Sequence, residues 1–296
     1  MTGEFMINPP RKILLATDLS SRSDRAQDRA VTLMKQYSCE LIVLHVIEPA
    51  KEAGFHRRVR FSSSYKQNEK LIEKTKWQLL DYLRDTGGKV SVRIENGKPS
   101  DVILQIAREE GCDLITTGVA RNEILGRCVL GKTVDKLIRS SEIPLLIVTG
   151  RVRSPYWNIV IASDFSDISK SALETAAAYF PDKKIAVLNA HAAPGSYAID
   201  DPESYRDQIR QMIFRDYKTF IDSADIADKL RESIGILIEW GSLPQLIKEL
   251  VYNSSVELVV IGSRDRGLMR NVFRQSNTMR VVNDLPCDAL VVRGKV

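Results

Sequence analysis

Residues that bind metals or form disulfides are scarce in this sequence. Its 296 residues include four cysteines and three histidines. The cysteines, at positions 39, 112, 128 and 287, follow none of the short spacings that are typical of metal or redox sites. We therefore expect reduced thiols. His45 and His191 each follow an apolar run, but no group of cysteines or carboxylates lies beside either one, which disfavours a metal site.

Long apolar runs are also missing. No segment approaches the roughly 20 apolar residues that a membrane span needs, and residues 1–10 lack the charged and apolar regions of a signal peptide. The composition, 44% hydrophobic and 27% charged, is ordinary for a globular protein. From these features we expect a cytoplasmic protein with no membrane partner.

Acidic residues do not balance the basic ones. The net charge is +5, and the excess lies in the first half: residues 1–150 contain 24 basic and 19 acidic side chains, whereas residues 151–296 contain 19 of each. Most of the excess falls between Lys51 and Lys98 and includes the run Arg57–Arg60. No recognised nucleic-acid-binding module accompanies it. We interpret the charges as a solvated face and disfavour nucleic-acid binding.

One short stretch matches a phosphate-binding pattern by its letters. Residues Gly126–Thr133 read GRCVLGKT and fit the P-loop expression G-x-x-x-x-G-K-[ST]. A P-loop follows a strand directly, but the nearest expected strand ends near Gly118, with seven residues intervening (119–125). No strand elsewhere ends in a lone aspartate with suitable neighbours for Mg²⁺. The context therefore argues against a P-loop NTPase.

The sequence contains an internal repeat. Residues Ile13–Ser20 read ILLATDLS and residues Ile159–Ser166 read IVIASDFS, an offset of 146. Later apolar runs and glycines recur in the same order. A period of this length indicates a duplicated domain rather than a solenoid. We predict two domains, residues 1–150 and 151–296.

Each half alternates short apolar runs with amphipathic stretches. In the first half, strands are expected at 12–17, 40–46, 90–95, 113–118 and 143–149. Near-continuous apolar runs are typical of strands buried on both faces. The pattern predicts an α/β fold: two tandem doubly wound domains, each with a five-stranded parallel sheet. Ligands in such sheets bind beyond the carboxyl ends of the strands.

Two aspartates occupy this position. Asp18 and Asp164 each follow the first strand of their half. Their carboxylates could accept hydrogen bonds from a ribose or another ligand hydroxyl, or could cap the helix that comes next. Because duplication copies structural and functional residues alike, the repeat leaves both interpretations open.

The ordered set of motifs resembles the universal stress protein family. It consists of a first-strand Ala16-Thr17-Asp18, a second-strand Leu-His-Val ending at Val46, a glycine-containing segment after the fourth strand and a final Ile-Pro-Leu-Leu-Ile-Val. The duplication is similar to that of the tandem members. The resemblance implies the strand order 3-2-1-4-5 and a pseudo-dimer within the chain. It also suggests the last strands, near 144–149 and 287–292, as pairing surfaces.

Nucleotide-binding members of that family carry Gly-x(2)-Gly-x(9)-Gly-Ser/Thr, which holds the phosphates of ATP. Gly118 matches the first glycine and Gly131 the third, whereas Arg121 replaces the second. Lys132 stands where Ser or Thr is expected, and Thr133 follows. Glycine suits such loops because it adopts positive φ and lets a phosphate approach the backbone. The positive charges of Arg121 and Lys132 would compensate for the missing glycine.

The resemblance also places the first-strand segment Ala16, Thr17 and Asp18 near the ribose and the backbone of Val46 near adenine. In the second half, Asp164 is the counterpart of Asp18, Gly262 matches the first glycine and Ser276 the hydroxyl residue.

Two replacements weaken the second motif. Asp265 and Gln275 stand in place of its other two glycines, and an acidic side chain repels phosphate. We therefore favour the first domain as the nucleotide site.

These observations lead to one functional hypothesis and two alternatives. We expect a stress-response protein that acts by binding, senses ATP through its first domain, with Mg²⁺ as a companion ion, and signals to a protein partner. One alternative is a slow ATPase or phosphotransferase, although no base for such chemistry is evident. The other is a partner-binding module that ignores nucleotides. Homodimerisation of the tandem chain stays open.

Overall fold

The computed structural model describes residues 8–20, 23–48, 72–74, 76–77, 79–81, 83–119, 121–124, 127–191, 202–263, 281–283 and 285–294. The chain divides into two compact units. One contains residues 10–118, and the other contains residues 119–296 together with the first nine residues. The predicted division at residue 150 stays a prediction.

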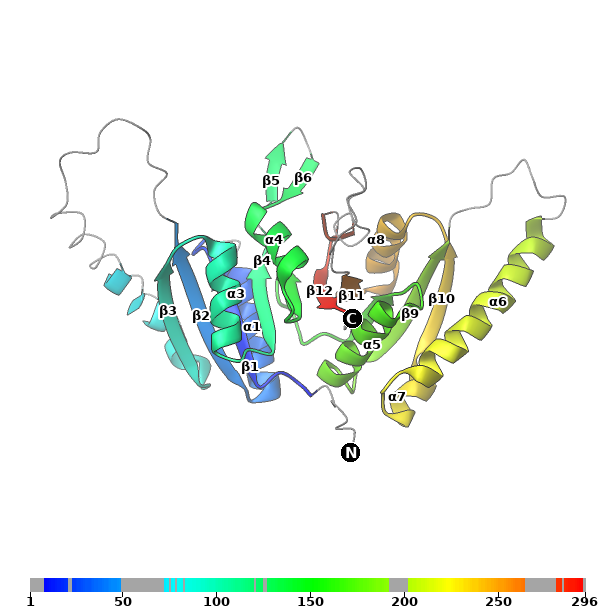
Figure 1. Ribbon diagram of the computed structural model, residues 1–296, viewed down its shortest axis with the longest axis horizontal. Coiled ribbons are helices and arrows are strands. Elements are labelled where there is room, and N and C mark those ends of the chain that lie inside the picture. The colour runs from blue at the N-terminus through cyan, green and yellow to red at the C-terminus, as the bar shows by residue number, and fades with distance from the viewer. Residues whose placement is uncertain are drawn as a thin grey trace. The chain divides into compact units, whose positions relative to one another are not determined.

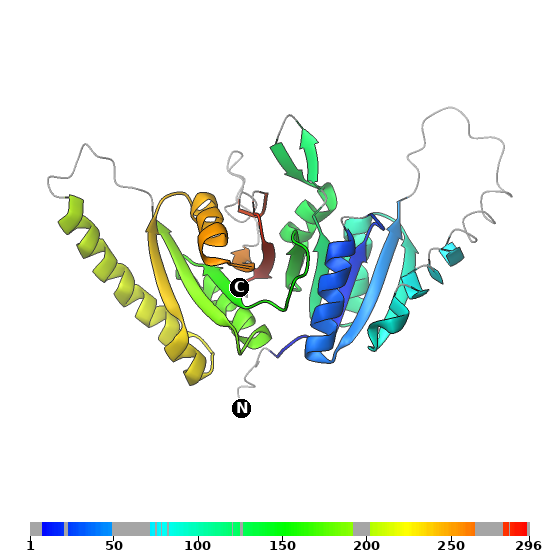
Figure 2. The same ribbon diagram turned by 180° about the vertical axis from the view of Figure 1, so that it is seen from behind.

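The unit of residues 10–118 is built on four parallel strands. They are β1 (Lys12–Thr17), β2 (Glu40–Ile47), β3 (Val90–Asn96) and β4 (Leu114–Gly118), in the order β3-β2-β1-β4. Helix α3 (Pro99–Glu109) covers one face of this sheet and helix α1 (Ser23–Tyr37) the other (Figures 1 and 2). A short 3₁₀ helix, η1 (Arg84–Thr86), precedes β3. The order agrees with the first four positions of the expected 3-2-1-4-5.

Helix α1 shows why the sequence pattern predicted this core. Ala26, Ala30 and Leu33 recur at helical spacing and are at most 1% exposed. The stripe packs on β1 and β4, and Met34 extends it. Burial of a leucine-sized side chain contributes about 1.5–3 kcal/mol, so this face fixes the helix on the sheet.

The unit of residues 119–296 contains a six-stranded sheet. Its strands are β7 (Leu145–Val148), β8 (Asn158–Ala162), β9 (Lys184–His191), β10 (Gly235–Trp240), β11 (Leu258–Ser263) and β12 (Asp288–Arg293). The order is β10-β9-β8-β11-β12-β7. Strands β8 to β12 therefore have the expected order 3-2-1-4-5 and are parallel.

Helices complete this unit. They are α4 (Lys132–Ser140), α5 (Asp167–Tyr179), α6 (Pro202–Ser223), α7 (Asp228–Ser233) and α8 (Leu243–Ser254). Helices α5 and α8 lie on opposite faces of the sheet (Figures 1 and 2). The segment before α4 is not an open glycine loop: β5 (Arg121–Ile124) and β6 (Arg127–Leu130) pair as an antiparallel hairpin. Part of GRCVLGKT is therefore a strand, which again excludes a P-loop conformation.

Strands β7 and β12 pair antiparallel, with Leu146 opposite Leu290. This agrees with the prediction that the last strand of each half is a pairing surface. The buried Asp288 supports the junction because its Oδ1 accepts hydrogen bonds from the amides of Thr149 (2.8 Å) and Gly150 (3.1 Å). Its Oδ2 accepts one from the hydroxyl of Tyr156 at 2.5 Å. One carboxylate thus ties the chain after β7 to β12.

Candidate functional site

The turn after β1 is held by two polar side chains. Thr17 Oγ1 accepts a hydrogen bond from the amide of Leu19 (3.1 Å) and bonds Ser23 Oγ (2.9 Å). Asp18 Oδ1 accepts from the amide and the hydroxyl of Ser20, at 3.0 and 2.6 Å. Leu19 between them has φ 61°, a left-handed conformation that is uncommon outside glycine and that the bonds on either side stabilise.

The same turn recurs after β8. Ser163 Oγ accepts from the amide of Phe165 (3.0 Å), and Phe165 has φ 60°. Asp164 Oδ1 accepts from the amide of Ser166 (3.1 Å) and the hydroxyl of Ser169 (2.7 Å). Ser166, not Asp164, is the N-cap of α5, because its side chain accepts from the amide of Ser169. The capping interpretation of Asp164 is therefore wrong in detail: the aspartate orders the turn and the serine caps the helix.

Both carboxylates are ionised at neutral pH. Burial raises the pKa of Asp18, but the hydrogen bonds from Ser20 and Ser23 outweigh it and lower the pKa below 3.8. The same balance, with Ser166 and Ser169 as donors, lowers the pKa of Asp164. Both side chains are exposed. Each can therefore offer a negative charge to a ligand while it holds its turn.

The serines that complete these turns were not among the predicted site residues. Each half carries the pattern Thr/Ser-Asp-x-Ser-x-x-Ser, at residues 17–23 and 163–169. Its identical spacing in the two halves was the available signal. The pattern explains why both aspartates are present without reference to a ligand.

The second strands support these turns differently. In the first unit, His45 Nδ1 lies 2.9 Å from the carbonyl oxygen of Thr17. In the second, Asn189 Nδ2 donates to the carbonyl of Ser163 (2.8 Å), and His191 bonds Asn189. The ring of His191 packs against Trp240 with centroids 5.5 Å apart. Burial lowers the pKa of His191, which favours its neutral form.

Three other predicted residues of the first unit lie at the same edge. Ala16 is buried and pairs with Leu44 and Thr117, so its side chain belongs to the core. Gly118 is the residue after Thr117 and ends β4, so it adjoins the strand end that carries Asp18. Val46 lies in β2 opposite Glu95 and is half-buried.

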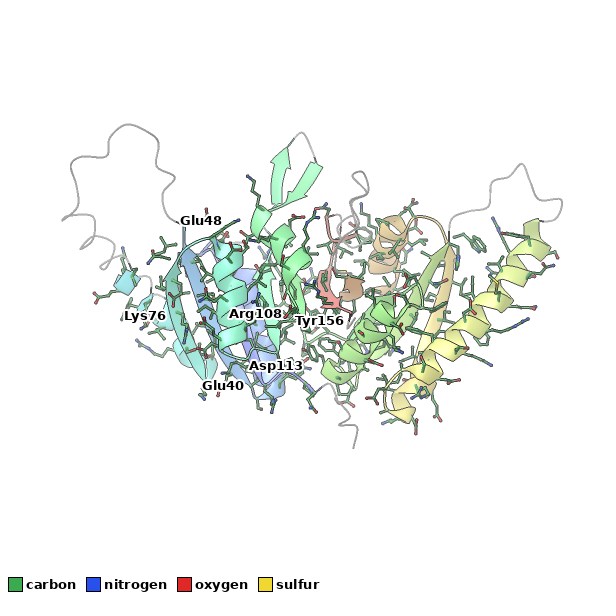
Figure 3. The ribbon with its side chains drawn as sticks, in the orientation of Figure 1. Glu40, Glu48, Lys76, Arg108, Asp113 and Tyr156 are labelled. Atoms are coloured by element: carbon green, nitrogen blue, oxygen red, sulfur yellow. The ribbon has the colours of Figure 1, made fainter. Side chains whose placement is uncertain are left out.

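Charged residues at the amino ends of these strands form a separate, structural group. Glu40 and Glu48 lie at opposite ends of β2, and Asp113 lies at the Glu40 end (Figure 3). Asp113 Oδ2 accepts from the amides of Arg11 (2.8 Å) and Lys12 (3.0 Å). Lys12 Nζ lies 3.8 Å from a carboxylate oxygen of Glu40. These contacts join strand starts and lie away from the expected ligand edge.

Gly131, Lys132 and Thr133 begin helix α4, in the other compact unit. Gly131 is the N-cap and has φ −59°, an ordinary value that does not by itself require glycine. The Lys132 side chain is exposed and Thr133 is half-buried. A helix N-terminus with free backbone amides and an adjacent lysine is suited to an anion.

Gly262, the matching glycine of the second half, has a packing role. A Cβ atom there would lie 2.5 Å from Ile168 Cγ2 and 3.0 Å from the Ile168 carbonyl oxygen. A Cβ atom at Gly294, the residue after β12, would lie 2.5 Å from Ile168 Cγ1 of the same side chain. The start of α5 therefore lies directly against these glycines, so packing with α5 explains Gly262 without a phosphate.

The remaining predicted site residues fall outside the described part of the chain. Ser276, Asp265, Gln275 and the run 57–60 are among them, and only the backbone of Arg121 is described, opposite Leu130 in the hairpin. Among the described residues, no cluster of histidine, cysteine, aspartate or glutamate side chains could hold a metal ion. In the same part of the chain, no helix combines the length and apolar character needed to cross a membrane.

The fold and the repeated turn define a tandem α/β protein with the same turn geometry at two equivalent strand ends. The family model for the universal stress protein family matches residues 10–149 and again residues 155–293. The chain belongs to the universal stress protein family and carries two of its domains in tandem.

Individual relatives match one half at a time or the whole chain. A universal stress protein of Methanocaldococcus jannaschii is 29% identical over 153 residues, 47% of this chain and 94% of that protein. One of Bacillus subtilis is 30% identical over 146 residues, 46% of this chain and 97% of that protein. A crystal structure from Archaeoglobus fulgidus covers 96% of this chain and 99% of its own, with TM-score 0.70 and 18% identity. That last likeness shows the shared fold.

Proposed function

We propose that this universal stress protein acts by binding, and that its first domain binds an adenine nucleotide. The observation that carries the proposal is the strand edge in residues 10–118, where the exposed, ionised Asp18 adjoins Gly118. A carboxylate in this position can accept hydrogen bonds from the two hydroxyls of a ribose. Gly118 offers backbone without a side chain to obstruct a phosphate.

The N-terminus of α4 supplies the second support. Gly131 precedes amides that lack helical partners, and Lys132 adds an exposed positive charge. Amides and charge together favour a polyphosphate.

The second domain receives a different proposal. Gly262 is closely packed against Ile168. Packing with α5 accounts for this glycine. We propose that this domain serves association with a partner without a nucleotide of its own.

Mass spectrometry of small molecules released from the denatured protein provides the direct test, together with calorimetric titration with ATP. We expect an adenine nucleotide in the first experiment or saturable binding in the second. Gly131→Asp places a carboxylate at the α4 N-terminus and is expected to abolish binding by charge repulsion. A protein that releases no nucleotide and shows no binding heat at millimolar ATP contradicts the proposal.

Gly235→Asp is the matched control, because it adds the same side chain where no atom lies within 4 Å of the new Cβ. It should leave ATP binding unchanged. Equal loss in both variants would show that net charge, rather than the α4 N-terminus, governs binding.

A further inference from the structure

Strand β10 is the outermost strand of its sheet and is unusually apolar for that position. It pairs with β9 on one side, and no other strand of the described residues pairs with it. Its sequence, GILIEW, contains one charged residue, Glu239. Natural edge strands are normally protected by charges, prolines or bulges because their free amides and carbonyls can accept another strand. The edge of β10 has little of this protection.

Helix α6 forms a groove with this edge. Figures 1 and 2 show α6 beside β10, and a space of about 420 Å³ is lined by Arg210, Gln211, Phe214, Arg215 and Ile238. Phe214 is 44% exposed although it lies in the groove. The groove thus combines an aromatic surface with two guanidinium groups.

The charges of the groove select the partner. Arg210 Nη1 lies 3.7 Å from Asp207 Oδ1, but both side chains are more than half exposed, so this pair is weak. Among the described residues, no carboxylate forms an ion pair with Arg215. An acidic partner would neutralise both arginines. A second copy of this chain would instead bring four arginines together, which argues against self-association here.

The spacing of the two arginines fits a strand. Arg210 and Arg215 are five residues apart on α6, which separates their Cα atoms by about 7.5 Å along the helix axis and by about 140° around it, and both side chains line the groove. Side chains two residues apart on a strand face the same way and are about 6.8 Å apart. Two acidic side chains at i and i+2 of an added strand can therefore meet the two guanidinium groups in one register.

We propose that the groove between α6 and β10 binds an extended acidic peptide segment, which adds to β10 as a further strand. Backbone hydrogen bonds to the edge of β10 supply sequence-independent affinity. Arg210 and Arg215 select segments with acidic residues at alternate positions, and the methylene groups of those residues cover Phe214. The proposed surface uses none of the residues of the proposed nucleotide site.

Fluorescence anisotropy with the full chain tests the proposal. The probe is a short fluorescein-labelled peptide of alternating glutamate and valine. We expect saturable binding that weakens as salt is added. The double variant Arg210→Glu/Arg215→Glu should weaken binding by at least about tenfold, since each reversal replaces attraction with repulsion. Lys184→Glu/Lys229→Glu reverses the same net charge at exposed sites outside the groove and should change binding less than about twofold.

A second probe separates strand addition from charge alone. The same peptide N-methylated at alternate residues cannot donate backbone hydrogen bonds along one edge, and it should bind at least about tenfold more weakly. If both peptides bind equally tightly, the peptide does not add to β10 as a strand. If the groove variant and the control variant lose the same affinity, the peptide does not bind in the groove. Two other outcomes also overturn the proposal. One is that dodecanoate, an apolar ligand with a single carboxylate, binds in the groove while the peptide does not. The other is that sedimentation shows a dimer of this chain and that the groove variant is monomeric.

Discussion

Replacing Gly262 with alanine tests whether this glycine is required for packing or for a ligand. The structure places the new methyl 2.5 Å from Ile168 Cγ2 and 3.0 Å from the Ile168 carbonyl oxygen. Carbon atoms in good contact lie about 3.5–4.0 Å apart, so the side chain is too close by about 1 Å. The carbonyl contact involves backbone, so the first turn of α5 must also shift.

This overlap is expected to lower the free energy of unfolding. An extra methyl in a filled site destabilises by about 1–3 kcal/mol, and each kcal/mol lowers the melting temperature of a domain of about 150 residues by about 2–4 °C. Thermal unfolding of Gly262→Ala should therefore show a clear decrease in the transition of the second domain. Gly235→Ala is the control, because its Cβ meets nothing within 4 Å, and its melting temperature should stay close to the original.

A double-mutant cycle identifies the neighbour responsible. In an Ile168→Ala background the side-chain overlap is gone and only the carbonyl contact remains. Gly262→Ala should therefore destabilise the protein by about 0.5–2 kcal/mol less in this background than in the original protein. If Gly262→Ala costs the same in both backgrounds, Ile168 does not confine the glycine. If the variant unfolds normally but loses a nucleotide, the packing explanation of Gly262 is refuted.

Three other features of the structure can be tested through named contacts and pKa values. Tyr156→Phe removes the donor to the buried Asp288 and should destabilise the protein by about 1.5–3 kcal/mol in thermal or urea unfolding. The folded-state pKa values of Asp18 and Asp164 are depressed. The two ionised carboxylates therefore stabilise the folded protein above pH 4, and this stabilisation is lost as the pH falls through the folded-state pKa values. Asp164→Asn should flatten this part of the plot of melting temperature against pH. Burial raises the pKa of Cys39 and Cys112 to about 11 and that of Cys287 to about 12, so iodoacetamide at pH 8 should leave these thiols unmodified until the protein is denatured, as peptide mass spectrometry can show.

The fold was accessible from the sequence because it depends on long, regular patterns. The apolar runs at β1 and β8 and the stripe Ala26, Ala30 and Leu33 identify strands and a helix without knowledge of their partners. The repeat then fixes the number of domains. Strand order came from the family resemblance, since hydrophobic periodicity does not specify which strands are neighbours.

The site was less accessible because it depends on contacts between distant residues. A match to a glycine motif cannot show that Gly131 has an ordinary φ. It also cannot show that Gly262 faces Ile168, a residue 94 positions earlier in the chain. The hairpin β5–β6 was missed for a similar reason: its strands are four residues long, too short for alternation to be recognised.

The two halves therefore share a turn after their first strands, whereas their sequences differ after the fourth strands, where Gln275 and Ser276 are the counterparts of Gly131 and Lys132. Asp18 and Asp164 have the same bonds to neighbouring serines and lie beside equivalent left-handed residues, so architecture alone is enough to explain both. A variant of either aspartate would disturb the turn as well as any ligand. Lys132 is exposed at the start of α4 and holds no such turn. The chemical distinction between the halves thus rests on the α4 N-terminus, and Lys132→Ala separates ligand binding from folding more cleanly than any change to the aspartates.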